Sequence, residues 1–205
     1  MLVKVNPDGS REVVKKSAVK DGKIISEIAE NCRLELDTVD VNFNDVEKNH
    51  WANSSIEFAV SRELFKGVDK DKFAPQNTMT RAMLVTVLAR LDNVDTDGGD
   101  IWYEKSINWA KERKLSDGSN PNGNITREQL VTIIYRYMNS PATNAKIDAY
   151  IDNGQISTYA VDAFNWAIEA GIIKGNADGM LNPQGSATRA EVATVLQRLL
   201  EYYLK

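Results

Sequence analysis

The apolar positions from residue 42 onward follow a helical period, and the same pattern occurs three times. Each copy begins at an aromatic residue, has apolar residues five, eight and thirteen positions later, and has a glycine at position sixteen. The aromatic residues are Trp51, Trp102 and Tyr159, and the glycines are Gly67, Gly118 and Gly175. Because this spacing keeps one helix face apolar, each copy predicts a helix of about four turns. We expect the glycine to end it, since glycine adopts a left-handed backbone at little cost.

A Thr-Arg pair opens a second apolar stripe in every copy, with apolar residues four, seven, eight and eleven positions after the threonine. The pairs are Thr80-Arg81, Thr126-Arg127 and Thr188-Arg189. Threonine is a favourable N-cap, and Gln129 and Glu191 stand where a capping box needs them, whereas copy 1 has Met83 there. Each copy therefore predicts helix, irregular loop and helix, and the three copies are expected to stack in one assembly.

The arginine of each pair falls at the first helical position, where the helix dipole disfavours a cation by about 0.3–1 kcal/mol. An arginine placed there three times indicates that it meets an anion. A bound ligand is one source of that anion, and a carboxylate from a neighbouring copy is the other. A planar guanidinium can hold a carboxylate through two parallel hydrogen bonds, which lysine cannot do.

Residues 1–41 show a different pattern, in which apolar and polar residues alternate with the two-residue period of β-strands. Turn sequences at 7–9 and 21–22 separate short apolar runs, which predicts hairpins, and apolar residues at 34–41 predict a further strand. The segment is too short to bury a core alone, so we expect the end of a preceding β domain. The first nine residues lack the apolar region of a signal peptide, which favours a fragment of a longer chain.

The composition excludes several kinds of function. The 205 residues carry a net charge of −4, which argues against general affinity for nucleic acid. With one cysteine, Cys32, and one histidine, His50, neither an intrachain disulfide nor a Cys/His zinc site can form. No apolar run is long enough to span a membrane. The acidic turns at 69–71 and 176–179 lack the ligand spacing of a calcium loop, so we expect no metal there.

These patterns resemble the S-layer homology domain, the wall-anchoring module of many bacterial surface proteins. Copy 1 carries the family elements Phe43-Asn44-Asp45-Val46, His50-Trp51-Ala52, Phe73-Ala74-Pro75 and Thr80-Arg81-Ala82. Copy 3 carries Gly171-Ile172-Ile173-Lys174-Gly175, Asp178-Gly179-Met180-Leu181-Asn182-Pro183 and Thr188-Arg189-Ala190-Glu191. Copy 2 departs most: 24 residues separate its aromatic residue from its threonine, against 29 in the other copies, and residues 119–123 replace the Phe-x-Pro element.

The resemblance implies a mainly α fold, a pseudo-threefold spindle of three helix–loop–helix repeats at 42–93, 94–148 and 149–205, preceded by the β-rich segment 1–41. It implies non-covalent anchoring of a surface protein to the cell wall through a secondary cell wall polysaccharide, often with ketal-linked pyruvate, held in grooves between repeats. The expected location is extracellular, in the cell wall or S-layer of a bacterium of the Gram-positive type. No catalysis, cofactor, nucleic acid or membrane insertion is implied.

By position in the family's motif, the groove residues are Arg81, Arg127, Arg189, Gly67, Gly118 and Gly175. Arg127 is expected to contribute least, because copy 2 departs from the pattern. Free amides at the helix starts and in the glycine loops would add donors for an anion.

The aromatic residues Trp51 and Trp102 are candidates to stack on sugar rings, although their place at the start of an apolar stripe favours core packing. Trp109 and Trp166 lie off the aligned stripe and are more open candidates for exposure. The alternative function is a structural module for protein–protein contact, self-association or S-layer assembly that has lost glycan binding.

Overall fold

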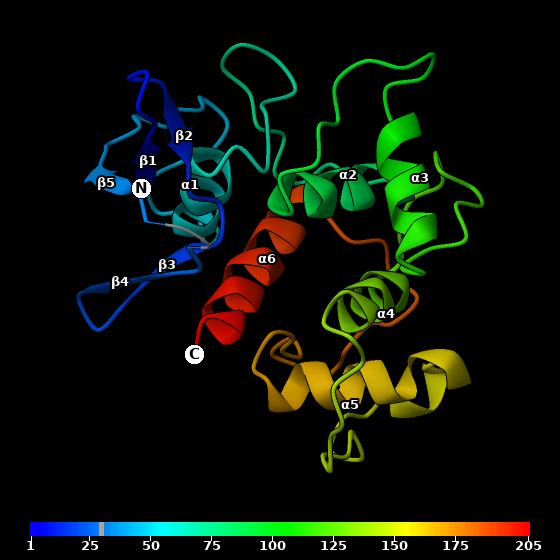
Figure 1. Ribbon diagram of the computed structural model, residues 1–205. Helices are drawn as coiled ribbons and strands as arrows, with labels where there is room; N and C mark the ends of the chain where they lie inside the picture. Colours follow the sequence, from blue (N-terminus) through cyan, green and yellow to red (C-terminus); the bar gives the residue numbers. More distant parts are fainter. Residues whose placement is uncertain (29–30) are drawn as a thin grey trace. The chain divides into compact units, whose positions relative to one another are not determined.

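The computed structural model describes residues 1–28 and 31–205, so that residues 29 and 30 of the predicted β-rich segment lie outside the described residues. Helices make up most of its regular structure (Figure 1). The strands are β1 Leu2–Val5, β2 Arg11–Val13, β3 Ser17–Lys20, β4 Lys23–Ser26 and β5 Arg33–Leu36. The α-helices are α1 Asn53–Ser61, α2 Arg81–Leu91, α3 Glu104–Glu112, α4 Arg127–Tyr137, α5 Val161–Glu169 and α6 Arg189–Tyr203, and the 3₁₀ helices are η1 Asn153–Gln155 and η2 Thr158–Ala160.

The chain divides into two units. The first unit contains Met1–Asn77, Arg90–Asn93 and Arg189–Lys205. The second unit contains Thr78–Ala89 and Val94–Thr188. Within the described part of the chain, no helix combines the length and apolar character that crossing a membrane requires.

Both predicted turns of the N-terminal segment join hairpins. Strand β1 pairs antiparallel with β2 across the first turn, and β3 pairs antiparallel with β4 across Asp21 and Gly22, which have φ angles of 50° and 71°. Strand β5 adds to the other edge of β1 but ends at Leu36, before the predicted end of the strand. One further backbone hydrogen bond, from the Asp37 amide to the Met1 carbonyl at 3.0 Å, follows the pair of Leu36 with Leu2.

The first helix of each copy is shorter than predicted, because α1, α3 and α5 have nine residues each. Each is followed by a residue with left-handed backbone: Glu63, Lys114 and Gly171 have φ angles of 58°, 57° and 71°. The next residue then donates its amide to the carbonyl five residues back, as in Leu64 to Ala59 at 3.0 Å. This is the Schellman motif, in which the apolar residue after the helix packs back on it. The apolar position thirteen is therefore this contact and not another helical turn.

The prediction that the glycines at position sixteen end these helices is wrong, because they lie in the loops beyond. Two of them are required by space: a Cβ on Gly67 would lie 2.7 Å from the Asp69 carbonyl oxygen, and one on Gly175 would lie 2.6 Å from the Tyr150 ring. Gly118 instead has a φ angle of 76°, which disfavours a side chain.

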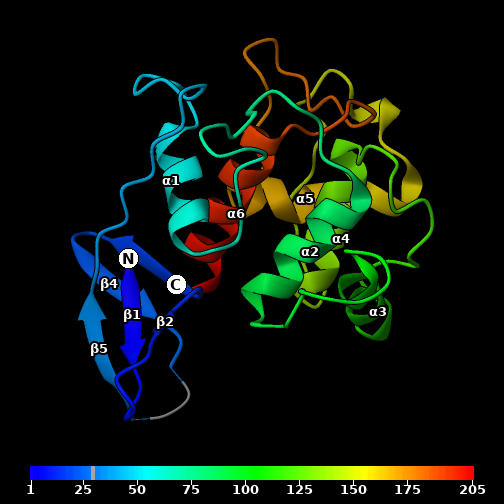
Figure 2. The ribbon, with the colours of Figure 1, turned by 90° about the horizontal axis from the view of Figure 1, so that it is seen from above.

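The core of the first unit forms where α1 packs against α6 (Figure 2). Ile56 and Ala59 of α1 and Leu196 and Leu199 of α6 are almost completely buried. In the second unit α4 packs on α5, and Leu130, Ile134, Phe164 and Trp166 are buried. The two apolar stripes of each copy therefore do predict the buried faces of the helices.

A closed cycle of backbone hydrogen bonds joins the three segments that precede the Thr-Arg pairs in the second unit. Met79 donates its amide to the carbonyl of Ala187, Ala187 donates to Ile125, and Ile125 donates back to Met79, each at 2.9 Å. All three residues are buried. Isolated antiparallel bridges extend the cycle at Thr78 with Thr188 and at Thr80 with Asn124.

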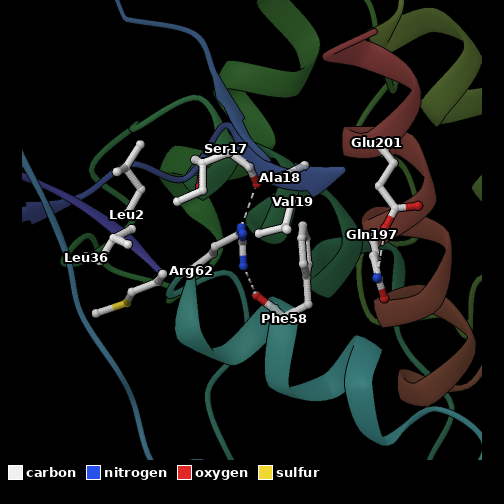
Figure 3. A pocket seen from close by; sticks show the side chains of 11 residues that line it. Leu2, Ser17, Ala18, Val19, Leu36, Phe58, Arg62, Gln197 and Glu201 are labelled. Carbon is white, nitrogen blue, oxygen red and sulfur yellow. Dashed lines mark hydrogen bonds between the residues drawn. The ribbon is translucent and has the colours of Figure 1, made fainter. Parts of the chain in front are cut away.

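Arg62 fastens the β-rich segment to the helices of the first unit (Figure 3). Its Nε donates to the Ser17 carbonyl of β3 at 2.9 Å, its Nη1 donates to the Phe58 carbonyl of α1 at 3.2 Å, and its guanidinium lies 3.6 Å from the centre of the Phe58 ring. Burial lowers the pKa of Arg62 to about 10. These residues line a cavity of about 230 Å³ beside Gln197 and Glu201 of α6.

We expect Arg62→Ala to lower the free energy of unfolding by about 2–3 kcal/mol, because a buried and a partly buried carbonyl lose a charged donor. Urea unfolding followed by circular dichroism measures the change. The control is Arg33→Ala, because Arg33 is exposed and its ion pair with Glu35 lies at the surface, and its loss should cost at most about 1 kcal/mol. Equal stability of Arg62→Ala and the wild type would contradict this role.

Candidate functional site

Arg189 lies at the start of α6 and reaches the loop that follows α1 in the first unit. Its Nε donates to the Phe73 carbonyl at 2.7 Å and its Nη2 donates to the Lys66 carbonyl at 2.9 Å. The guanidinium lies over the rings of Phe73 and Phe65, with 4.5 Å and 5.3 Å to their centres, and the residue is 7% exposed. Burial lowers the pKa of Arg189 to about 10, although the charge of Asp45 opposes the shift. Arg189 is therefore a buried cation that remains charged at neutral pH.

Arg127 makes the corresponding contact within the second unit. Its Nε donates to the carbonyl of Leu181 at 2.8 Å. Leu181 stands 22 positions after Tyr159, as Phe73 stands 22 positions after Trp51. In both copies the arginine thus binds the same carbonyl of a loop that belongs to another copy.

Arg81 is held differently, because the loop that it reaches in copy 2 is shorter. Its Nη2 donates to Ser116 Oγ at 3.2 Å and forms an ion pair with Asp117 at 3.1 Å. Its Nε is buried and has no hydrogen-bond partner among the described residues. The carboxylate of a neighbouring copy, the alternative source of an anion considered from the sequence, is therefore present at Arg81.

The amides at the helix starts are not free, so the expectation that they would serve an anion is wrong. In α2, α4 and α6 the amides of the first two residues donate to carbonyls in the loop of another copy, at 2.8–3.0 Å. The pairs are Arg81 to Gly123, Ala82 to Pro121, Arg127 to Gly185, Glu128 to Pro183, Arg189 to Asn77 and Ala190 to Pro75. The proline stands five positions before a threonine in every copy, so copy 2 keeps this part of the loop. Anion recognition at these helix starts therefore depends on the guanidinium groups.

The glycines occupy the same place in each loop. In copies 1 and 2 each one immediately follows a residue that binds a Thr-Arg arginine. Gly67 follows Lys66, whose carbonyl accepts from Arg189, and Gly118 follows Asp117, which pairs with Arg81. The amide of Gly118 donates to Ser116 Oγ at 3.2 Å. Gly175 holds the equivalent position in copy 3.

The aromatic residues at the start of the copies are exposed, so the interpretation as core residues is wrong. Trp51, Trp102 and Tyr159 are 60%, 51% and 52% exposed. They precede the helices, since α1 begins at Asn53 and α3 at Glu104, so their side chains do not join the buried stripe. The prediction of an exposed Trp166 is also wrong, because it is 2% exposed. Trp51 and Trp102 are thus at the surface, with the His50 ring stacked near Trp51 at 5.6 Å between ring centres.

Two aspartates that were not among the predicted site residues hold the arginine-binding loops in place. The Asp45 carboxylate accepts the amides of Phe73 and Ala74 at 2.9 Å and 2.7 Å. The Asp152 carboxylate accepts those of Leu181 and Asn182 at 2.9 Å and 2.7 Å. Burial opposes ionisation of Asp45, but the two amide bonds outweigh it and lower its pKa. The Phe-x-Asp-Val element contained this signal for Asp45.

Glu128 is a buried carboxylate at the second position of α4, where copies 1 and 3 have the alanines Ala82 and Ala190. It accepts hydrogen bonds from the Ser157 amide at 3.1 Å, Ser157 Oγ at 3.0 Å, the Tyr159 hydroxyl at 2.7 Å and Gln184 Nε2 at 2.9 Å. Burial, together with the hydrogen bond to Glu128, raises the pKa of Tyr159 to about 12. The sequence offers no signal for this contact beyond the glutamate itself.

Two segments of the chain, residues 42–82 and 152–193, match the model of the S-layer homology domain. The chain is 32% identical to an amylopullulanase of Thermoanaerobacterium thermosulfurigenes over 79% of this chain and 10% of the relative. It is 25% identical to the S-layer protein sap of Bacillus anthracis, over 76% and 21%. It is 25% identical to a cellulosome-anchoring protein of Acetivibrio thermocellus, over 66% and 35%. The chain thus spans about a tenth to a third of the length of these relatives.

We expect Glu128→Ala to lower the free energy of unfolding by about 2–4 kcal/mol, because Ser157 and Tyr159 would lose a buried charged acceptor. Thermal and urea unfolding measure the effect. Glu112→Ala, at an exposed glutamate at the end of α3, is the matched control and should change stability by less than about 0.5 kcal/mol. A similar small change in both variants would show that the Glu128 contacts do not stabilise the second unit.

Tyr159 should contribute a pH-dependent part of the stability. Because its folded pKa of about 12 exceeds that of an unfolded tyrosine, about 10, this contribution is complete below pH 10 and is lost as the pH rises through 12. The difference in unfolding free energy between the wild type and Tyr159→Phe should therefore shrink over this window. A difference that is constant from pH 8 to 12 would contradict the raised pKa.

Proposed function

We propose that this chain anchors a surface protein to the bacterial cell wall without a covalent bond, by binding the secondary cell wall polysaccharide. The S-layer homology matches and the S-layer and cellulosome-anchoring relatives indicate a cell-surface or S-layer location in bacteria of the Gram-positive type. An S-layer homology domain is an anchoring module, so the enzyme names among the relatives are attributed to other parts of those much longer proteins. The chemistry proposed for this chain is capture, with no bond made or broken.

The proposed architecture is a pseudo-threefold arrangement of repeats 42–93, 94–148 and 149–205, with the β-rich segment 1–41 as the end of a preceding domain. The cycle of hydrogen bonds through Met79, Ala187 and Ile125 supports it, because it joins corresponding positions of the three copies. The repeated contact from a Thr-Arg arginine to the loop of another copy supports it as well. In this arrangement the arginines and the glycine loops line grooves between repeats.

The environment of Arg189 is the observation that carries the proposal. Its hydrogen bonds to Phe73 and Lys66 go to two carbonyl oxygens, and within the described residues it makes no salt bridge with a carboxylate. Burying a guanidinium without an ion pair is costly, and a ligand carboxylate would provide the missing anion. A pyruvate ketal on a sugar presents such a carboxylate, and the remaining N–H groups of Arg189 can bind it. Exposed rings such as Trp51 add faces on which a sugar can stack.

A binding assay with purified cell walls tests this function. We expect the chain to bind walls that retain the secondary polysaccharide and not walls from which acid has removed it. Arg189→Ala should weaken binding at least about tenfold, and Arg189→Lys should restore only part of it, because lysine cannot form two parallel hydrogen bonds. The exposed Arg33→Ala is the control for loss of one positive charge.

Thermal unfolding of each variant separates loss of binding from loss of fold. If the chain binds equally to walls without the polysaccharide, the proposed function is wrong. Self-association in the ultracentrifuge together with no affinity for the polysaccharide would instead support the structural alternative, a module for protein–protein contact.

A further inference from the structure

We propose that the carboxylate of Asp117 occupies the anion position of Arg81, so that this arginine takes no part in binding the wall saccharide. The inference rests on the proposed function, because it states which of the Thr-Arg arginines is available to an anionic sugar. Arg81 and Asp117 both belong to the second unit. The loop of copy 2 thus supplies the carboxylate that a ligand would otherwise provide to Arg81.

The charge of one loop position differs among the copies. The residue fifteen positions after the aromatic residue is Lys66 in copy 1 and Lys174 in copy 3, but Asp117 in copy 2. A lysine at this position adds positive charge to a site for an anion. An aspartate reverses that charge and repels a second carboxylate, which leaves this loop suited to an internal ion pair.

The contacts of the two arginines differ in the same way. Nη2 of Arg189 donates to the main-chain carbonyl of Lys66 at 2.9 Å, whereas Nη2 of Arg81 donates to the Asp117 side chain at 3.1 Å. The Asp117 carboxylate is held in position by Ser119, whose amide and hydroxyl donate to it at 2.9 Å and 2.8 Å. These bonds, with a smaller contribution from the charge of Arg81, lower the pKa of Asp117 and keep it ionised.

A second, independent observation concerns Nε of Arg81. The equivalent nitrogens of Arg127 and Arg189 donate to the carbonyls of Leu181 and Phe73. The loop of copy 2 is shorter, and Nε of Arg81 is buried without a hydrogen-bond partner among the described residues. Arg81 therefore keeps a donor that none of the described residues uses, and removing Asp117 should convert the arginine into a binding group.

The experiment combines Arg81→Gln with Asp117→Lys, the residue type of the other two loops. The probe is a methyl hexopyranoside that carries a 4,6-linked pyruvate ketal, titrated into the full chain by calorimetry. Arg81→Gln alone should change its binding less than about twofold. Asp117→Lys should add about one bound saccharide per chain, and the double variant should lose that gain.

Asp8→Lys is the matched control, because Asp8 accepts the amide and the hydroxyl of Ser10 in the same Asp-x-Ser turn and the change in net charge is equal. It should leave the number of bound saccharides unchanged. Melting curves of all variants verify that they are folded at the titration temperature.

Each outcome decides between the claims. If the wild type binds the probe and Arg81→Gln weakens binding as strongly as Arg189→Ala does, Asp117 does not close the site and the inference is overturned. The same holds if Asp117→Lys adds no saccharide, or if Asp8→Lys adds as much. If neither the wild type nor Asp117→Lys binds, the proposed function fails and the inference fails with it.

Discussion

The rest of the structure depends on one constraint: the buried backbone amides at the starts of α2, α4 and α6 must find hydrogen-bond acceptors. A buried amide without a partner is costly, so the segments before the Thr-Arg pairs must exchange hydrogen bonds. In the second unit Met79, Ile125 and Ala187 do so in a closed cycle. The first amides of each helix then bind carbonyls of a proline-containing loop. These bonds bring each Thr-Arg arginine to the loop of another copy.

The same bonds explain why the arginine side chains carry the charge chemistry of these positions. With the first two amides of each of these helices already used, an anion depends on the guanidinium, and the neighbouring loop decides what the guanidinium meets. At Arg189 it meets carbonyl oxygens and aromatic rings, and at Arg81 it meets the Asp117 carboxylate. At the second position of α4, Glu128 places a buried carboxylate that accepts a hydrogen bond from the Tyr159 hydroxyl. Loops that differ by a few residues thus give corresponding arginines different electrostatic surroundings.

Much of the fold could be predicted from local patterns. The turns at Asp21-Gly22 and around Gly9 join hairpins, and Thr126 and Gln129 form the predicted capping box. The length of the first helices was overestimated, because an apolar residue that packs back in a Schellman motif has the spacing of one more helical turn. The position of Trp51 favours core packing for a related reason: Trp51 extends the apolar stripe in sequence but precedes α1 in space and is exposed.

The sequence by itself determined where helices and turns form and that three arginines begin helices, because capping, apolar period and turn chemistry act over a few residues. Only the tertiary structure decided which group each arginine meets. Arg81 and Asp117 are 36 residues apart, and Arg189 and Phe73 are 116 apart, so no local rule relates them. Burial, hydrogen bonding and charge at these positions arise from contacts between distant segments, and those contacts distinguish Arg81, which pairs with a carboxylate, from Arg189, which donates to main-chain carbonyls.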